Sequence, residues 1–142
     1  MTMKTKFGTV LLVDDNESDN FLHERVIEKS GITDHVVIAM NGKEALDYLQ
    51  AKHELNSSTN TEPSPELILL DINMPVMDGW EFLEAYQKIQ EVQTGKTEII
   101  ILTTSLNPSD KTKADEILSP GRYYNKPLTL PMILDIMEKF YP

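Results

Sequence analysis

Four short apolar runs, each about the length of a β-strand, constrain the fold of this chain most strongly. They are rich in β-branched and aliphatic residues, and most of them are continuous rather than alternating with polar residues. Continuous runs of this length are typical of strands that are buried on both faces of a sheet. The runs lie at Thr9 to Val13, Val36 to Met40, Leu67 to Leu70 and Ile99 to Leu102, and a shorter fifth strand is expected around Arg122 to Asn125.

Segments with a helical repeat of apolar residues separate these runs. A fourth helix is expected to begin at Asn107-Pro108, since Asn is a favoured cap and Pro is favoured in the first turn, and Thr129 is expected to cap the last helix. Strands that alternate with helices predict an α/β fold, in which a parallel sheet carries helices on both faces. The apolar stripes are Phe21, Leu22, Val26 and Ile27; Ala45, Leu46 and Leu49; Phe82, Leu83, Tyr86 and Ile89; and Met132, Ile133, Ile136, Met137 and Phe140.

The length of 142 residues predicts a single domain over residues 1–142, with a core from about residue 9 to residue 140. The segment from Lys52 to Pro65 is rich in Asn, Ser and Thr and contains two prolines, so it is expected to form a polar loop. No repeat of fixed period and no break in composition divides the chain.

The charge balance excludes several kinds of partner. The formal net charge is -10, and such a chain repels both nucleic-acid phosphates and anionic lipid, so we expect neither direct nucleic-acid binding nor membrane association. The apolar runs are far shorter than the roughly 20 residues that a membrane helix needs. The chain contains no cysteine, which excludes disulfides and thiolate chemistry, and the expected compartment is the cytoplasm.

Polar side chains follow four of the five expected strands. Asp14 and Asp15 end the first strand, Asp71 ends the third, Thr103 ends the fourth, and Lys126 follows the fifth. Open α/β sheets bind ligands at the carboxyl ends of their strands. The sequence therefore predicts that three carboxylates, a hydroxyl and an ammonium converge on one pocket.

Three carboxylates in one pocket repel one another unless a cation neutralises them, and oxygen ligands favour a hard ion. Because Mg²⁺ usually takes only one or two protein carboxylates together with phosphate oxygens, the pattern favours Mg²⁺ beside an anion held by Lys126. A carboxylate can act as a nucleophile and form an aspartyl phosphate. Asp71, which is central in the expected pocket, is the candidate nucleophile.

Four blocks of sequence resemble the response-regulator receiver domain, and the resemblance extends from about Thr9 to Phe140. The block after the third strand is the most specific of the four. The blocks are Val13-Asp14-Asp15, Leu70-Asp71-Ile72-Asn73-Met74-Pro75-Val76-Met77-Asp78-Gly79, Leu102-Thr103 and Lys126-Pro127. The resemblance implies a flavodoxin-like sheet with the strand order 2-1-3-4-5.

The resemblance also implies a role for each matching residue. Asp71 accepts a phosphoryl group from a sensor histidine kinase or a phosphotransfer protein, and Lys126 and Thr103 contact that group. Mg²⁺ is bound by Asp15, Asp71 and the backbone carbonyl of Asn73, with Asp14 acting through a bound water. Tyr123, three residues before Lys126, matches the aromatic switch residue of the family. The expected protein is a stand-alone, chemotaxis-regulator-like response regulator that signals to a protein partner and catalyses only its own phosphorylation and dephosphorylation.

Other interpretations of these residues remain open from the sequence. Asp14 and Asp15 could cap the first helix. A phosphatase that works through an aspartyl phosphate would want an acid two residues after the nucleophile, where Asn73 stands. A flavodoxin-like nucleotide or flavin module would want a Gly- or Ser/Thr-rich loop after the first strand, where the acidic segment Asp14 to Glu17 stands. Thr104 departs from the Ala or Ser common in the family and could slow phosphate access.

Overall fold

The predicted strands form one parallel sheet in the order β2-β1-β3-β4-β5, which confirms the flavodoxin-like α/β fold. The computed structural model describes residues 7–59, 66–90 and 97–140. The strands are β1 (Thr9–Val13), β2 (Val36–Ala39), β3 (Glu66–Leu70), β4 (Thr97–Thr103) and β5 (Tyr123–Asn125). The helices are α1 (Glu17–Ser30), α2 (Gly42–Thr59), α3 (Gly79–Gln90), α4 (Pro108–Leu118) and α5 (Leu130–Phe140).

The register of the sheet brings the carboxyl ends of its central strands level. Val13, the last residue of β1, lies opposite Leu70, the last residue of β3, and the Asp71 amide donates a hydrogen bond to the Val13 carbonyl at 2.9 Å. At the far side of the sheet, Thr103 of β4 lies opposite Asn125 of β5. The residues that follow β1, β3 and β5 therefore emerge at the same edge.

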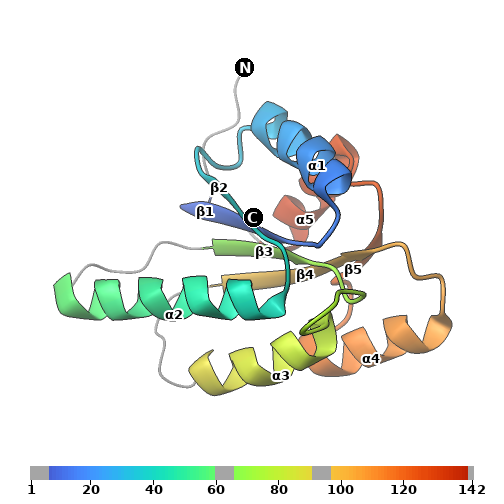
Figure 1. Cartoon of the computed structure of the whole chain (residues 1–142). Coiled ribbons are helices and arrows are strands. Elements are labelled where there is room, and N and C mark those ends of the chain that lie inside the picture. Colours follow the sequence, from blue (N-terminus) through green and yellow to red (C-terminus); the bar gives the residue numbers. More distant parts are fainter. Residues whose placement is uncertain (1–6, 60–65, 91–96, 141–142) are drawn as a thin grey trace.

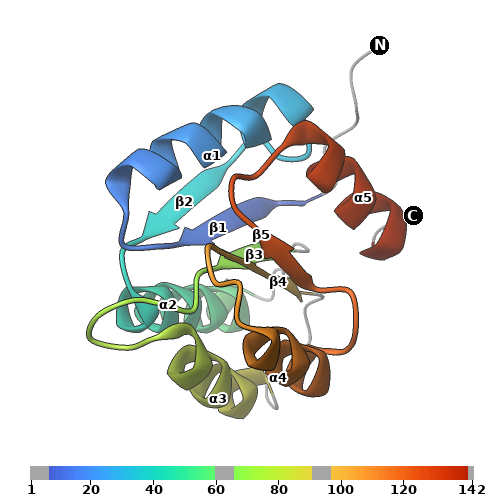
Figure 2. The same ribbon diagram turned by 90° about the vertical axis from the view of Figure 1, so that its right-hand side faces the viewer.

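The helices cover both faces of the sheet in two layers. Helices α1 and α5 pack on one face, and α2, α3 and α4 pack on the other (Figures 1 and 2). Side chains alternate between the faces along each strand, and the buried residues accordingly form two clusters. Leu12 and Leu69 belong to the cluster under α1 and α5, whereas Leu11, Ile68 and Phe82 belong to the cluster under the other three helices.

Local sequence signals begin two of the helices as expected. The Asn107 side chain accepts a hydrogen bond from the Ser109 amide, and Pro108 occupies the first turn of α4. Thr129 Oγ1 accepts a hydrogen bond from the Met132 amide at 3.3 Å at the start of α5. Each side chain satisfies a backbone donor that the first turn of a helix leaves unpaired, so both predicted caps are confirmed.

The predicted polar loop from Lys52 to Pro65 is wrong in its first half, because α2 continues to Thr59. The stretch from Lys52 to Leu55 contains Lys, Glu and Leu, which favour helix, and the first proline stands only at Pro63. The polar composition of this segment predicted a loop. No proline stands before Pro63, however, so the helix continues to Thr59. Residues 60–65 of the predicted loop lie outside the described residues.

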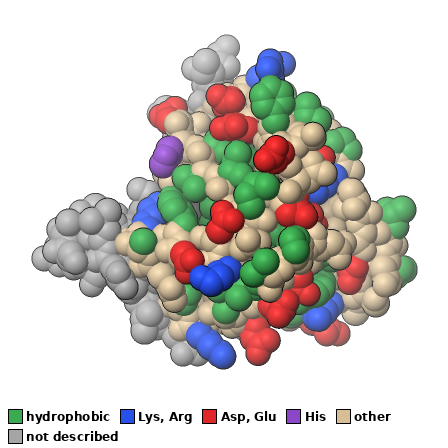
Figure 3. All heavy atoms as spheres, viewed as in Figure 1, with side chains coloured by type: hydrophobic (Ala, Val, Ile, Leu, Met, Phe, Trp, Pro, Cys, Tyr) green, Lys and Arg blue, Asp and Glu red, His purple; other side chains and the backbone are tan. Residues whose placement is uncertain are grey.

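The surface bears charges of both signs. On the face seen in Figure 3, acidic side chains are scattered among basic and hydrophobic ones rather than gathered in one patch. Within the described ranges, no helix combines the length and the apolar character that crossing a membrane requires.

Candidate functional site: an acidic cluster at the carboxyl edge of the sheet

Three aspartates meet where β1 and β3 end. One carboxylate oxygen from each of Asp14, Asp15 and Asp71 lies within 4.8 Å of the others. Asp14 and Asp71 are buried, with 5% and 7% of their surface exposed, whereas Asp15 is exposed. The sheet register explains the meeting, because the residues after Val13 and Leu70 are neighbours across adjacent strands. The structure thus brings together the three carboxylates that the sequence placed in one pocket.

Backbone amides fix two of these carboxylates. Asp14 Oδ1 accepts a hydrogen bond from the Asn16 amide at 2.9 Å, and Asp71 Oδ1 accepts one from the Asn73 amide at 3.2 Å. Asn16, rather than Asp14 or Asp15, caps α1, since its side chain accepts a hydrogen bond from the Asp19 amide. The alternative that the two acids serve as helix caps is therefore wrong, and their carboxylates are available to the pocket.

The Lys126 ammonium binds into the same cluster from the turn after β5. Its Nζ lies 2.6 Å from Asp14 Oδ2, 2.9 Å from Asp19 Oδ2 and 3.2 Å from Asp71 Oδ2. The Lys126 side chain is 8% exposed, so the ammonium itself is largely shielded from water. A buried lysine almost always needs such partners, because an isolated buried charge is costly.

The charges of the pocket shift one another's pKa values. Burial alone would lower the pKa of Lys126, but its hydrogen bonds to Asp14 and Asp19 and the charge of Asp71 outweigh burial, so the pKa lies well above its ordinary value. Burial raises the pKa of Asp14 above its ordinary value, although the hydrogen bond from Lys126 opposes that change. Lys126 therefore stays a cation at neutral pH, which is the form that neutralises nearby negative charge.

Thr103 ends β4 beside this cluster. It is fully buried, and its Oγ1 accepts a hydrogen bond from the Ser105 amide at 3.2 Å. The Thr103 carbonyl accepts a hydrogen bond from the Lys126 amide at 2.9 Å, which ties the ends of β4 and β5 together. The next residue, Thr104, is exposed.

The loop after Thr103 is held by β5. The Tyr123 hydroxyl donates to the Ser105 carbonyl at 2.9 Å, and the Asn125 side-chain amide donates to the same carbonyl at 2.8 Å. Asn125 also reaches the Thr103 carbonyl at 3.3 Å. The predicted switch residue Tyr123 is thus connected to the acidic cluster through a loop of only a few residues.

Comparison with known proteins shows to which family a chain with this fold and these site residues belongs. Residues 10–137 match the model of the response regulator receiver domain. The chain belongs to the response regulator receiver domain family. The matched segment contains the acidic cluster and all of the sheet except Thr9, so this receiver domain spans nearly all of the described structure.

Individual relatives agree with this assignment. The response regulator Rcp1 of Synechocystis is 33% identical over 76% of this chain and 69% of its own length. The chemotaxis protein CheY of Halobacterium salinarum is 34% identical over 91% of this chain and 92% of its own. A two-component response regulator from Cytophaga hutchinsonii, of solved structure, superposes with a TM-score of 0.79 at 28% identity, covering 94% of this chain and 96% of that one.

Two polar residues of the receiver domain near the cluster were not predicted from the sequence. Asp19, in the first turn of α1, contacts Lys126, and its position three residues after the Asn16 cap is an ordinary one for an acid at a helix start. His23, one turn further along α1, is buried. Burial and the nearby Lys126 charge lower the pKa of His23 below its ordinary value. The position of Asp19 and His23 beside Lys126 follows only from the packing of α1 next to the turn after β5.

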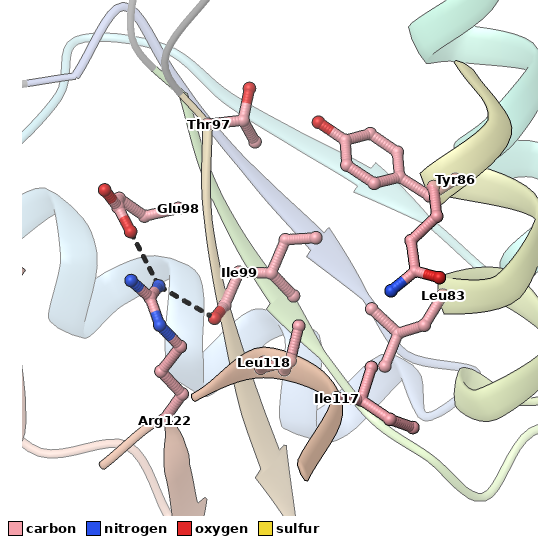
Figure 4. A pocket seen from close by; sticks show the side chains of 9 residues that line it. Leu83, Tyr86, Thr97, Glu98, Ile99, Ile117, Leu118 and Arg122 are labelled. Carbon is pink, nitrogen blue, oxygen red and sulfur yellow. Dashed lines mark hydrogen bonds and ion pairs between the residues drawn. The ribbon is translucent and has the colours of Figure 1, made fainter. Parts of the chain in front are cut away.

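A hollow of the receiver domain lies at the end of the sheet opposite the acidic cluster. It has a volume of about 200 Å³ and is lined from α3, α4 and the amino ends of β4 and β5 (Figure 4). Arg122 pairs there with Glu98 at 2.6 Å and donates to the Ile99 carbonyl at 3.4 Å. This hollow contains none of the predicted site residues, so it is separate from the acidic cluster.

Proposed function

We propose that this protein is a response regulator that accepts a phosphoryl group on Asp71 in a Mg²⁺-dependent reaction and then changes its surface to signal to a protein partner. The observation that carries the proposal is the meeting of Asp71 with two further aspartates and with the Lys126 ammonium, which lies 3.2 Å from Asp71 Oδ2. An anionic nucleophile, oxygen ligands for a cation and a buried ammonium are the groups that phosphoryl transfer to a carboxylate requires.

The proposed reaction transfers a phosphoryl group from a histidine of a sensor kinase or a phosphotransfer protein. Receiver domains are phosphorylated by such proteins. A carboxylate oxygen of Asp71 attacks phosphorus, the P–N bond breaks, and the imidazole leaves with the bonding electrons. Lys126 neutralises charge on a phosphoryl oxygen, and the Thr103 hydroxyl hydrogen-bonds another. The protein then catalyses only its own phosphorylation and dephosphorylation.

The donor set of the pocket fits Mg²⁺. Carboxylates are hard oxygen ligands, and Asp15 and Asp71 with the Asn73 carbonyl are the proposed direct ligands, while Asp14 acts through water. Bound there, the ion would neutralise charge on the transferred phosphoryl group. A cytoplasmic location is part of the proposal, supported by the absence of cysteine and by the nature of the proposed phosphodonors.

Mg²⁺ is expected to raise the thermal stability of the metal-free protein. An ion bound only by the folded pocket contributes about 2.7 kcal/mol to the free energy of unfolding at 100 times its dissociation constant. Asp15→Asn should remove most of the increase in Tm, because it removes a proposed Mg²⁺ ligand. Asp15 is exposed, so the substitution leaves the core unaltered. Calorimetry with and without millimolar Mg²⁺ provides the measurement, and an unchanged Tm in the wild type would contradict a metal site here.

One experiment distinguishes the proposed function from the two alternatives. The protein is incubated with Mg²⁺ and either a small phosphodonor or beryllofluoride, and the product is located by mass spectrometry. A stable adduct on Asp71, without turnover of other phosphate esters, is expected. Continuous ester hydrolysis would identify a phosphatase, and binding of a flavin or nucleotide without any adduct would identify a binding module.

The proposed output surface consists of α4, β5 and α5. Phosphorylation adds up to about two negative charges and three acceptor oxygens to the pocket, which draw Thr103 and Lys126 inward. The loop after Thr103 is bonded to Tyr123, so its movement reaches β5 directly. Ala114 is the one buried residue of α4 in the described structure, and a helix anchored so lightly shifts at low cost.

Hydrogen exchange with and without beryllofluoride is expected to show this movement. Changes in protection should concentrate in Thr103 to Ile117 and in Arg122 to Thr129, because these segments contain the loop and the face connected to it. Thr103→Ala should still bind beryllofluoride but should show smaller changes. Changes confined to α1 would place the output surface away from α4, β5 and α5.

A further inference from the structure

Asp19 joins α1 to the end of β5 through the Lys126 ammonium. Its Oδ2 lies 2.9 Å from Nζ, although the two residues are 107 positions apart in the chain. The Asp19 side chain is 31% exposed, whereas the Lys126 side chain is 8% exposed. Asp19 therefore approaches the ammonium from the solvent side, while Asp14 and Asp71 approach it from within the pocket.

The carboxylates in contact with the ammonium equal its donors in number. A protonated lysine carries three N–H groups and no acceptor. The oxygens at 2.6, 2.9 and 3.2 Å belong to Asp14, Asp19 and Asp71 respectively. Nζ donates hydrogen bonds to Asp19 and to Asp71 and forms an ion pair with Asp14, so two acids besides the proposed phosphoacceptor hold the ammonium.

Asp19 differs from the other two acids in its relation to the metal site. Among the described residues, the group able to share one cation is Asp14, Asp15 and Asp71, and Asp19 stands outside it. A cation in the pocket therefore competes with Lys126 for the oxygens of Asp14 and Asp71. The Asp19 carboxylate is left to the ammonium alone.

We propose that Asp19 is a positioning residue that holds the Lys126 ammonium over Asp71 when the pocket contains its cation. This inference rests on the proposed phosphoryl acceptance at Asp71. Lys126 now donates a hydrogen bond to Asp71 Oδ2, and in the phosphorylated protein it donates that bond to a phosphoryl oxygen instead. The contact between Lys126 and Asp19 remains. Asp19 takes no part in bond making, since it touches Lys126 and not the reacting atoms.

A simpler role for Asp19 is the stabilisation of α1, because acids in a first turn interact favourably with the helix dipole. Glu17 occupies the same turn and carries the same charge. Glu17→Gln therefore removes an equivalent charge from the helix and serves as the matched control for Asp19→Asn. An effect found with Asp19→Asn alone is an effect on the lysine rather than on the helix.

The first measurement compares the rates of phosphoryl incorporation from a small phosphodonor at saturating Mg²⁺. Asp19→Asn is expected to be slower than wild type by on the order of tenfold, since a misplaced catalytic contact costs up to about a hundredfold. Glu17→Gln should match the wild type. In a Lys126→Gln background, Asp19→Asn should cause no further loss, because its effect passes through the ammonium.

The second measurement does not depend on phosphorylation. Proton exchange of the Lys126 ammonium is followed by ¹⁵N NMR before and after Mg²⁺ is added, and Mg²⁺ affinity is measured by calorimetry. We expect the wild-type ammonium to remain protected in Mg²⁺, whereas the Asp19→Asn ammonium loses protection. The Mg²⁺ affinity of Asp19→Asn should stay close to that of wild type, as expected for an acid outside the metal-binding group.

The outcomes separate this inference from the proposed function. If wild type takes up no phosphoryl group, the proposed function fails, and the ammonium signal still shows whether Asp19 holds Lys126. Equal rates and equal ammonium protection in wild type and Asp19→Asn would overturn the inference. A faster Asp19→Asn variant would also overturn it, because Asp19 would then compete with the phosphoryl group for Lys126.

Discussion

Asp71→Asn is expected to lose phosphoryl incorporation completely while keeping the fold. The amide has nearly the shape of the carboxylate but is a poor nucleophile, so no aspartyl phosphate forms. Its oxygen still accepts the hydrogen bond that the Asn73 amide gives to Asp71 Oδ1. Incorporation from a radiolabelled small phosphodonor measures the loss, and circular dichroism reports the fold.

Asp78→Asn is the matched control for this variant. Asp78 lies in the same loop, and its Oδ1 accepts a hydrogen bond from the Glu81 amide at 2.9 Å, which an asparagine oxygen also accepts. This control should be labelled at the wild-type rate. Equal labelling of Asp71→Asn and wild type would move the phosphoacceptor to another residue.

Gly79→Ala is expected to lower the free energy of unfolding by about 3 kcal/mol, near the upper end of the usual cost of overpacking. A Cβ at this position would lie 2.6 Å from the Ile72 Cα and 2.7 Å from the Asp71 carbonyl oxygen. Both are backbone atoms of the segment that carries the proposed phosphoacceptor. The loop must therefore shift, so phosphoryl incorporation should fall as well as stability. Urea denaturation measures the loss of stability.

Gly42→Ala provides the comparison for this steric argument. A Cβ there would meet the Met77 side chain at 2.8 and 3.0 Å and the Met77 carbonyl oxygen at 3.1 Å. The methionine side chain adapts by rotation, and the carbonyl needs to move by only a few tenths of an ångström. We expect this variant to lose clearly less stability than Gly79→Ala. Equal losses would show that the contact with the Asp71 backbone does not determine the cost, since helix propensity favours alanine over glycine at both positions.

The sheet and most of the acidic cluster could be predicted because they depend on local patterns and on one topological rule. Continuous apolar runs marked the strands, and parallel strands bring their carboxyl ends to one edge. Asp14, Asp15 and Asp71 follow such ends directly, so their positions in the sequence determine their meeting. The end of α2 was predicted less well, because helix-favouring residues continue into a segment that is polar in composition.

Asp19 could not be predicted as a partner of Lys126 because its contact depends on how a helix docks. Within α1, Asp19 is an ordinary acid of the first turn, and no spacing in the sequence connects it to a lysine after the fifth strand. The bonds from Tyr123 and Asn125 to the Ser105 carbonyl are equally invisible in the sequence, since they join a loop to a neighbouring strand. Side-chain contacts between elements require the packed structure.

The division of the interior into two clusters has a consequence for how such a protein diversifies. Each strand residue packs above or below the sheet, so a substitution in the layer of Ala114 reaches the layer of Ile27 and Ile133 only through the backbone. Substitutions under α4 can therefore accumulate while the packing under α1 and α5 stays intact. The sheet separates the two layers, so each can change its packing without disturbing the other.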